Sequence, residues 1–347
     1  MARGTGLVSS RVAAMHGYTP GEQPQAGRLI KLNTNENPYP CSPLVAGAIA
    51  DEARSLQLYP SPNADALRAK AAQVYRVAPE QVLVGNGSDE VLAMILRACV
   101  LDGDAVAYAV PTYSLYRTLA QSVGARVVEI AADGSAIPRG VADARARVTF
   151  VCTPNSPTGR AIALDAIAEF ARSADGVVVV DEAYADFGTA TALTILADHP
   201  NMVVTRSFSK SFSLAGLRLG LAFGHADFLA ELLKVKDSYN ISRLAIAAGV
   251  AALDDYAWMQ SNVSRVRATR ARVTARLRAA GFRVEDSSAN FVWVDCSSAG
   301  GGRPVYDKLR AAGVLVRYFD VEGLRGGIRA SIGTDEQMDV MLAVLGG

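Results

Sequence analysis

Short apolar runs alternate with helix-like segments between about Asp65 and Arg218. Five of these runs are rich in β-branched residues and predict strands: Val82–Val84, Ala105–Ala109, Val148–Cys152, Val177–Val180 and Met202–Thr205. The unbroken valines at 177–180 are typical of a strand buried on both faces, as in parallel sheets covered by helices. The pattern therefore predicts an α/β fold with a large, mostly parallel sheet flanked by helices.

The pattern changes after Tyr239. A helical stretch from Leu244 to about Ala280 precedes two strand-like runs, Phe291–Val294 and Val314–Val316. This order indicates a smaller α+β domain that the chain reaches through a long helix. We expect residues 1–37 to form an N-terminal arm and part of the small domain, residues 38–250 the large domain, and residues 251–347 the small C-terminal domain.

The charge balance argues against nucleic acid and membrane partners. The 347 residues carry 35 Lys and Arg against 34 Asp and Glu, so the net charge is +1 and provides no global field for anionic partners. Six arginines between Arg265 and Arg278 fall on two stripes of one amphipathic helix, which we interpret as a solvated face. Apolar runs stay well short of the ~20 residues of a membrane span. We expect a soluble protein.

The number and spacing of the cysteines and histidines argue against a disulfide framework and a metal site. The four cysteines are far apart without a C-x-x-C pair, and the three histidines have no acidic cluster at metal-ligand spacing. The sequence therefore predicts no disulfide framework, no metal site and a location in the reducing cytoplasm. The beginning of the chain predicts an N-terminal arm, with a transit peptide as the alternative.

The segment Ser207–Gly220 carries the most informative lysine. Lys210 lies among hydroxyl side chains directly after a buried strand, and Arg218 follows eight positions later. A lysine with little access to solvent has a lowered pKa, which suits it to form a Schiff base with an aldehyde. Ser207, Ser209 and Arg218 can hold a phosphate nearby. Taken alone, a solvated loop lysine is the commoner explanation.

A glycine-containing turn follows the first predicted strand. In Gly85–Glu90, glycines allow a tight turn, and the N-terminus of the following helix offers free N–H groups to a phosphate. A dinucleotide fingerprint would need a third glycine where Glu90 stands, which disfavours a dehydrogenase. The alternative is a simple turn in which Ser88 or Asp89 caps the helix.

Two further loops follow predicted strands. Asp181 ends the valine strand and could pair with a protonated pyridine nitrogen, with Tyr184 on the same loop. An ordinary helix cap is the alternative for Asp181. The loop Thr153–Gly159 contains two prolines and Asn155, whose amide can donate to a ring oxygen. Parallel strands bring such loops to one edge of the sheet.

The lysine segment, the Asp181–Tyr184 loop and the proline-asparagine loop occur in the order found in fold-type I pyridoxal-phosphate aminotransferases, which the chain resembles. Within that class it is similar to the histidinol-phosphate aminotransferase family. Further stretches carry the resemblance almost from end to end: Tyr18–Pro24, Leu32–Pro40, Gly85–Glu90, Pro111–Tyr116, Lys236–Asn240 and Ile328–Thr334.

The resemblance implies pyridoxal 5'-phosphate as the cofactor, with Lys210 forming the Schiff base and later moving a proton between substrate and cofactor. Lys210, Asp181 and Tyr184 would be the catalytic residues, with Asp181 keeping the pyridine nitrogen protonated. It also implies a homodimer in which Tyr59 reaches the neighbouring subunit's cofactor phosphate. The implied cofactor-binding residues are Gly87, Ser88, Asp89, Tyr113, Asn155, Asp181, Tyr184, Ser207, Ser209, Lys210, Arg218 and Tyr59.

The substrate residues implied by the resemblance are Tyr18, Asn35, Asn155, Arg317 and Arg329. The two arginines suit carboxylate and phosphate groups because a planar guanidinium binds such anions through two parallel hydrogen bonds. The segment Phe319–Arg329 departs from the family pattern, since acidic and glycine residues replace its usual Tyr-Gly motif. This departure concerns the substrate side chain rather than the cofactor.

The implied activity is transamination between histidinol phosphate and 2-oxoglutarate, giving imidazole acetol phosphate and glutamate in histidine biosynthesis. An aromatic amino-acid aminotransferase of the same fold is the first alternative, because it would share every cofactor residue. A pyridoxal-phosphate lyase or decarboxylase acting on a phosphorylated amino acid is the second. The three differ in which bond at the substrate Cα is aligned for cleavage.

Overall fold

Seven strands form the large sheet in the computed structural model, whose described residues are 5–23, 29–132 and 136–346. In spatial order they are β2 Val82–Gly85, β8 Gly220–Phe223, β7 Met202–Ser207, β6 Val177–Asp181, β5 Val148–Cys152, β3 Ala105–Val110 and β4 Arg126–Ala131. Only β8 runs antiparallel to its neighbours β2 and β7, among the strand pairs of this sheet. The predicted large, mostly parallel α/β sheet is confirmed.

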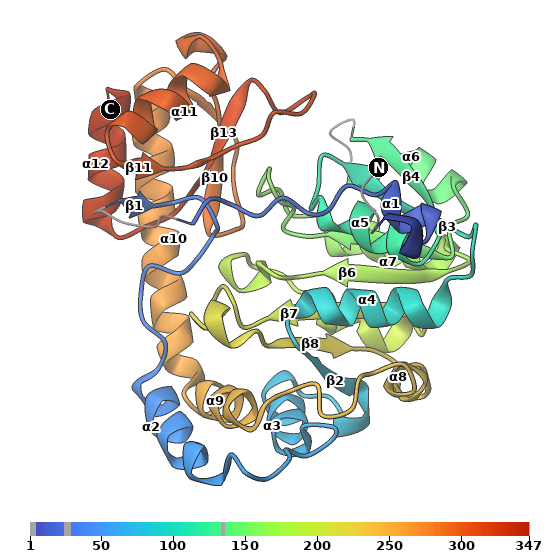
Figure 1. Cartoon of the computed structure of the whole chain (residues 1–347). Coiled ribbons are helices and arrows are strands. Elements are labelled where there is room, and N and C mark those ends of the chain that lie inside the picture. The colour runs from blue at the N-terminus through green and yellow to red at the C-terminus, as the bar shows by residue number, and fades with distance from the viewer. Residues whose placement is uncertain (1–4, 24–28, 133–135, 347) are drawn as a thin grey trace.

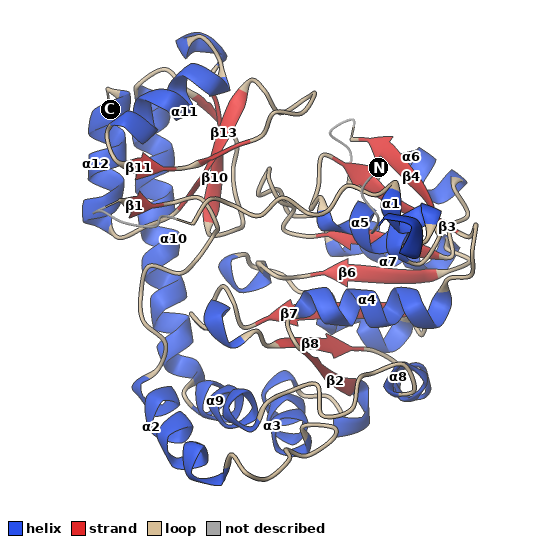
Figure 2. Ribbon diagram, viewed as in Figure 1, coloured by secondary structure: helices blue, strands red, loops and turns tan. Residues whose placement is uncertain are grey.

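Alternating side chains of the central strands build two separate cores. Val178 and Val180 of β6 face one side of the sheet, whereas Val179 faces the other, because successive residues of a strand point in opposite directions. One face is covered by α4 Ser88–Cys99, α5 Leu115–Ser122 and α8 Ala226–Leu233. The opposite face is covered by α3 Asp65–Tyr75, α6 Arg139–Asp143, α7 Leu164–Ser173 and α9 Arg243–Asp254. Figure 2 shows these helices around the sheet.

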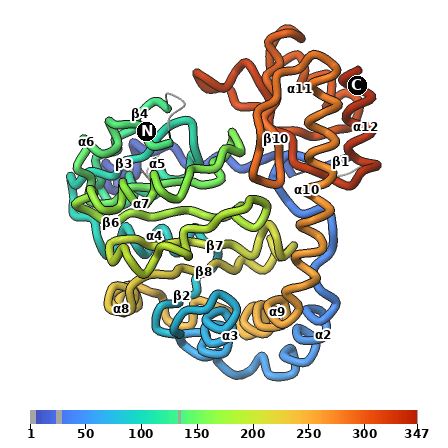
Figure 3. Tube along the Cα trace, turned by 180° about the vertical axis from the view of Figure 1, so that it is seen from behind, coloured from blue at the N-terminus to red at the C-terminus, as the bar shows by residue number. Residues whose placement is uncertain are grey.

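A smaller domain is built from both ends of the chain. Its four-stranded antiparallel sheet has the order β12 Arg317–Tyr318, β13 Gly327–Ser331, β10 Phe291–Asp295 and β9 Arg283–Val284. Beside it β1 Ile30–Lys31 pairs in parallel with β11 Val314–Leu315. The helices of this domain are α11 Gly302–Ala311 and α12 Asp335–Leu345. The N-terminal strand and the C-terminal segment thus lie side by side (Figures 1 and 3).

One long helix connects the two domains. It is α10 Tyr256–Ala279, which Figure 1 shows running from the bottom of the large domain to the small one. The prediction of one continuous helix from Leu244 to about Ala280 is wrong, because α9 ends before Asp255. This residue has non-helical dihedrals (φ −105°, ψ 51°), and its carboxylate accepts a hydrogen bond from the N–H of Trp258 at 3.4 Å. Asp255 is therefore the N-cap that starts a new helix.

Four of the six arginines of α10 are exposed, in line with the predicted solvated face, whereas Arg270 and Arg272 are partly buried. Arg272 pairs with Asp335 and Asp339 of α12. Arg270 departs from the predicted solvated face, since its Nη1 donates to the carbonyls of Phe187 and Ala289. In this way α10 joins the small domain to the loops of the large sheet.

The N-terminal segment crosses from one domain to the other. It begins with the short helices Thr5–Leu7 (η1) and α1 Ser10–Ala13 beside α5, and continues to β1 in the small domain (Figure 1). After β1 the chain descends along α10 to α2 Pro43–Glu52. Residues 1–4 and 24–28 of the expected arm, including Pro24, lie outside the described residues. The domain boundaries at residues 37 and 250 stay predictions.

The described part of the chain contains no helix that is both long and apolar enough to cross a membrane. Within residues 5–23, 29–132 and 136–346, no group of three or more His, Cys, Asp or Glu side chains could hold a metal ion.

Candidate functional site

The loops that follow β5, β6 and β7 bring most of the expected site residues to one edge of the large sheet. These strands are parallel, so Asp181 at the end of β6 and Asn155 and Lys210 after β5 and β7 all lie at the same edge. The apolar, largely β-branched runs of these strands favour buried strands, and polar residues gather where the strands end. An open parallel sheet binds ligands at this edge.

Lys210 lies in the loop after β7, with its amino group turned toward Thr34, in the segment between β1 and α2. Nζ donates to the carbonyl oxygen of Thr34 at 3.1 Å and lies 5.7 Å from the ring centroid of Tyr184. Burial and then the positive charge of Arg329 lower the pKa of Lys210 from 10.5 to about 8. A substantial fraction of this amine is therefore neutral, and so nucleophilic, near neutral pH.

Asp181 ends β6 as a buried carboxylate, 3% exposed. Its Oδ2 accepts from the hydroxyl of Tyr116 at 2.7 Å, and its Oδ1 accepts from the Ala183 N–H at 3.2 Å and the Thr205 hydroxyl at 3.3 Å. Burial raises the pKa of Asp181, and the hydrogen bond from Tyr116 acts in the opposite direction. Such a carboxylate favours a cationic group as its next partner.

Tyr184 and Asn35 contact each other across the domain boundary. Asn35 Nδ2 donates to the Tyr184 hydroxyl at 3.0 Å, and Asn35 Oδ1 accepts from Ser331 Oγ at 3.0 Å. Burial raises the pKa of the Tyr184 hydroxyl to about 12, while the charge of Arg329 opposes this shift. Asn35 has a left-handed backbone (φ 57°), and its carbonyl accepts from Asn290. Asparagine tolerates this conformation better than most residues.

A cluster of hydroxyl and N–H groups forms at the N-terminus of α4. Gly87 precedes Ser88, the first residue of α4, with a φ of 83°. Arg218 donates from Nη1 to Ser209 Oγ at 3.3 Å and from Nη2 to Asp89 Oδ2 at 3.2 Å. A Cβ on Gly87 would lie 2.7 Å from Nη2 of Arg218. The positive φ favours glycine at position 87, and a side chain there would displace the guanidinium of Arg218. The helix end and the arginine together suit a phosphate.

Ser207 lies at the end of β7, where its Oγ accepts the N–H of Ser209 at 3.2 Å. Both serines are buried, with exposed fractions of 9% and 5%. The structure thus brings the expected phosphate residues together around Arg218.

Tyr113 and Asn155 lie on neighbouring loops. The Tyr113 hydroxyl donates to Asp89 Oδ1 at 3.3 Å, and its ring contacts the edge of Tyr18 with centroids 5.8 Å apart. Asn155 Nδ2 donates to the Pro111 carbonyl and to Thr158 Oγ1, both at 3.0 Å. Its two amide hydrogens are therefore used within the protein, and a bond to a cofactor oxygen requires one of them to be exchanged.

Two arginines of the small domain face this edge. Arg329 of β13 donates to Ser156 Oγ and to the Asn33 carbonyl, both at 2.9 Å, whereas its buried Nε has no hydrogen-bond partner among the described residues. Burial lowers the pKa of Arg329. Arg317 of β12 donates to the carbonyls of Thr19 and Pro20, which tie the N-terminal segment to the small domain.

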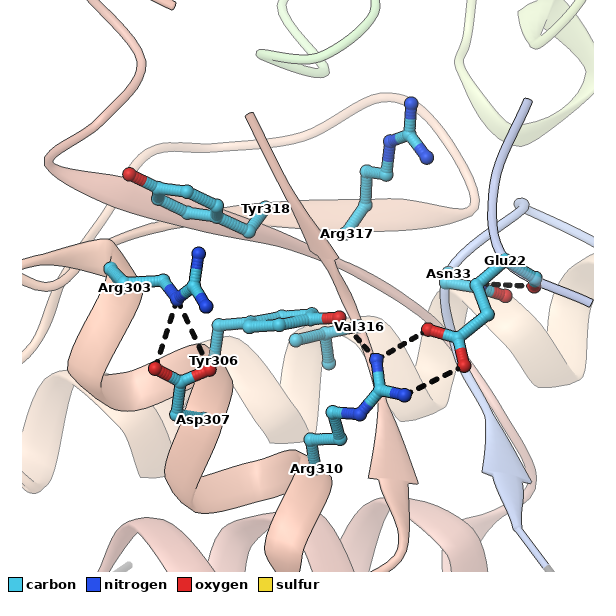
Figure 4. A pocket seen from close by; sticks show the side chains of 9 residues that line it. All are labelled: Glu22, Asn33, Arg303, Tyr306, Asp307, Arg310, Val316, Arg317 and Tyr318. Atoms are coloured by element: carbon cyan, nitrogen blue, oxygen red, sulfur yellow. Dashed lines mark hydrogen bonds and ion pairs between the residues drawn. The ribbon is translucent and has the colours of Figure 1, made fainter. Parts of the chain in front are cut away.

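A cavity of about 340 Å³ lies beside Arg317, between α11 and β12. Figure 4 shows Arg310 holding Glu22 in this cavity and Arg317 pointing away from that pair. The Arg310–Glu22 ion pair has N–O distances of 2.5 and 2.9 Å. Apart from Arg317, the expected site residues do not line this cavity. The Arg310–Glu22 ion pair anchors the N-terminal segment, which also contains Tyr18, beside Arg317.

A buried ion cluster joins the Asp181–Tyr184 loop to the lysine loop. Arg206 Nη1 lies 3.1 Å from Glu182 Oε2, and its Nη2 lies 2.6 Å from Asp186 Oδ1. Asp186 Oδ2 also accepts from Ser211 Oγ at 2.5 Å. Ser211 directly follows Lys210, so the backbone around Lys210 is fixed by a carboxylate from the neighbouring loop.

Tyr59 lies apart from these residues within the chain. It is 78% exposed, and its ring stacks on Tyr239 at a centroid distance of 4.6 Å. Its expected contact with the cofactor of a neighbouring subunit stays a prediction.

Sequence reasoning assigned no role to three residues that contact the site. Thr34 contacts Lys210 through its backbone carbonyl, and Asn37 Nδ2 donates to the carbonyls of Lys210 and Ser211 at 3.2 Å. Both lie in the Leu32–Pro40 stretch that carried the family resemblance. The third residue, Tyr116, ends the Pro111–Tyr116 stretch, and its polar neighbours Ser114, Arg117 and Thr118 give no local signal of its complete burial.

Comparisons with known proteins agree along the whole chain. The family model for aminotransferase class I and II matches residues 27–345. Histidinol-phosphate aminotransferase 1 of Nostoc sp. is 42% identical, over 98% of this chain and 98% of that protein. Histidinol-phosphate aminotransferase of Citrifermentans bemidjiense is 44% identical, over 97% of each. The crystal structure of histidinol-phosphate aminotransferase from Sinorhizobium meliloti, in complex with pyridoxal-5'-phosphate, superposes with a TM-score of 0.90 at 25% identity, over 99% of this chain and 97% of that chain.

Proposed function

The chain belongs to the aminotransferase class I and II family, and we propose that it is a pyridoxal-phosphate-dependent enzyme that moves the amino group of L-histidinol phosphate to 2-oxoglutarate. The shared name of full-length relatives at 42–44% identity supports this substrate. The expected family membership and fold class are confirmed, and the α/β architecture matches that of the Sinorhizobium meliloti enzyme.

The residues present fit pyridoxal phosphate. Lys210 supplies an amine of lowered pKa, and the Gly87 turn with Arg218 supplies a cradle that a Cβ would fill. Asp181 supplies a buried carboxylate for the pyridine nitrogen. When bound, pyridoxal phosphate supplies an aldehyde that receives the amino group and a ring that withdraws electrons.

Different side chains of the site would bind the cofactor and transfer the proton. Lys210 would hold the aldehyde, and its amine would hold or move the proton at the substrate Cα. Asp181 keeps a positive charge on the ring nitrogen. Ser88, Ser207, Ser209 and Arg218 hold the phosphate. Tyr113 would contact the ring face, and Tyr184, with Asn155 after exchange of one of its hydrogen bonds, would orient the ring oxygen.

The single observation that carries the substrate assignment is the pair of guanidiniums on the small domain. Arg329 has a buried Nε without a protein partner among the described residues, and its charge lowers the pKa of Lys210. An anionic substrate group would satisfy this N–H. Arg317 lies on the neighbouring strand β12 and provides a second site for an anion. Two arginines suit a reaction whose two substrates carry a phosphate and carboxylates in turn.

Two further proposals concern the homodimer and the location in the cell. Leu56 and Leu58 are 58% and 57% exposed beside Tyr59, and we propose that this apolar surface joins a second copy so that Tyr59 reaches the partner's cofactor phosphate. The four cysteines are all unpaired, which supports a cytoplasmic location.

Single-turnover absorbance of the bound cofactor tests the substrate assignment. We expect histidinol phosphate to convert the cofactor at least about 100-fold more efficiently than phenylalanine or histidinol, because a site built for an anion discriminates strongly against ligands without it. Arg317→Gln should reduce this preference, whereas Arg303→Gln on α11 should leave it intact. Equal conversion by phenylalanine would favour the aromatic alternative, and release of carbon dioxide or phosphate would favour the lyase.

A further inference from the structure

Tyr116 lies at the centre of an aromatic cluster behind the site. Its ring stacks on Phe150 with centroids 4.5 Å apart and planes at 15°, and the rings of Tyr108 and Tyr113 contact it edge-on at 5.6 Å. The side chain is fully buried. Packing on these sides leaves the ring little freedom, so the direction of its hydroxyl is fixed.

This hydroxyl is aimed at the carboxylate of Asp181. It donates to Oδ2 at 2.7 Å, which is the shortest of the hydrogen bonds to that carboxylate among the described residues. The other two donors, Ala183 and Thr205, both contact Oδ1. Tyr116 is therefore the donor that fixes the orientation of the second carboxylate oxygen.

Burial opposes the charge of Asp181, whereas the three hydrogen bonds that its carboxylate accepts favour the ionised form, and the one from Tyr116 does so most strongly. Burial raises its pKa, and the nearby Asp89 acts in the same direction. Tyr116 opposes this tendency, and its own pKa is raised well above 10 by burial and by Asp181, so it remains a proton donor at physiological pH. The further titratable groups coupled to Asp181 are Cys152, Tyr113 and Tyr184, and burial raises the pKa of each.

We propose that Tyr116 is a positioning residue for transamination, which holds Asp181 as an ionised and oriented carboxylate for the pyridine nitrogen. The inference rests on the proposed function, because it requires a cofactor whose ring nitrogen faces Asp181. Tyr116 acts through Asp181, since its buried hydroxyl is already occupied by the carboxylate.

The test is Tyr116→Phe, which removes one oxygen and keeps the ring. Tyr108→Phe is the matched control, because Tyr108 belongs to the same cluster and its hydroxyl donates to Glu129 at 2.8 Å, away from Asp181. We expect Tyr116→Phe to lower kcat about 10- to 100-fold, the range of a hydrogen bond to a charged group, with KM changed less than about twofold. Tyr108→Phe should keep the wild-type kcat.

Two further readouts separate positioning from simple support of the fold. In the loaded enzyme, the ¹⁵N chemical shift of labelled pyridoxal phosphate should show a smaller protonated fraction of the ring nitrogen in Tyr116→Phe than in Tyr108→Phe. In the apoenzyme, ¹³C NMR of labelled aspartate should show that the Asp181 titration midpoint rises by about 1 to 2 in pH in Tyr116→Phe alone.

The outcomes distinguish this inference from the proposed function. Equal kcat values and equal Asp181 titrations in the two variants would overturn the role of Tyr116. A wild-type enzyme that uses another amino donor would overturn the substrate assignment, but the ¹⁵N and ¹³C comparisons do not depend on the donor. A matching melting temperature for the two variants would show that a loss of kcat does not arise from unfolding.

Discussion

The lowered pKa of Lys210 predicts how much faster its amine reacts with an aldehyde at neutral pH than an exposed lysine does. With its pKa lowered to about 8 by burial and Arg329, about one amine in ten is neutral at pH 7. At the ordinary lysine pKa of 10.5 the neutral fraction would be about one in 3000. Because only the neutral amine attacks an aldehyde, Lys210 should react about 300-fold faster at pH 7 than an exposed lysine.

The perturbation is Arg329→Gln. It removes the positive charge that disfavours the protonated form of Lys210, so the pKa of Lys210 should rise and its neutral fraction at pH 7 should fall. Arg325→Gln is the matched control, because Arg325 is exposed and pairs with Asp320 at 2.8 Å. It precedes the same strand but is not among the charges that shift the pKa of Lys210.

The assay uses apoenzyme and pyridoxal, which lacks the phosphate and so adds no phosphate charge to the site. Borohydride reduction at intervals and peptide mapping give the capture rate at Lys210 from pH 6 to 10. The rate should rise about tenfold for each increment of one in pH and level off near pH 8. The plateau should begin at higher pH in Arg329→Gln only. A wild-type rate that still rises at pH 10, or an unchanged Arg329→Gln profile, would refute the reasoning.

Three further changes test other parts of the site. Lys210→Ala should abolish glutamate formation from 2-oxoglutarate, and wild-type turnover in a coupled assay would contradict its role. Asp181→Asn should lower kcat about 100-fold while the cofactor dissociation constant, measured by fluorescence, changes much less, because the ring charge matters most in the transition state. Arg206→Met should lower the free energy of unfolding in urea by about 3–5 kcal/mol, since the buried Glu182 and the partly buried Asp186 lose their cation; an unchanged urea midpoint would argue against this.

The sequence predicted the strands that contain long apolar, β-branched runs. The run at 177–180 is a continuous apolar stretch and the run at 148–152 is interrupted only by Thr149, and β5 and β6 coincide with them to within one residue. β4 was not predicted because it lies at the sheet edge, where its residues are half-buried or exposed. β8 was hidden by its short Gly-Leu-Ala-Phe sequence after the lysine segment. The break at Asp255 depends on one side-chain cap, which hydrophobic periodicity does not report.

Loop residues that follow strands could be placed from sequence, because parallel strands bring their carboxyl ends together. This reasoning located Lys210 and Asp181 at one sheet edge. It could not pair Asn35 with Ser331, because nothing local relates residues at opposite ends of the chain. The contact between Tyr116 and Asp181 likewise depends on how a helix packs across the sheet.

The pairing of β1 with β11 and of Asn35 with Ser331 also has a consequence for the order in which the molecule assembles. The Asn35–Ser331 contact closes a loop of 296 residues, which costs about 5 kcal/mol of chain entropy. During synthesis β1 leaves the ribosome long before β11 exists, so the large sheet can form while the N-terminal strand still has no neighbour. We expect a nascent chain released before β11 to contain all seven strands of the large sheet and to lack both substrate arginines. Synthesis of the C-terminal residues is therefore the step that allows β1 to pair with β11 and brings the N-terminal segment across the sheet edge that carries the site.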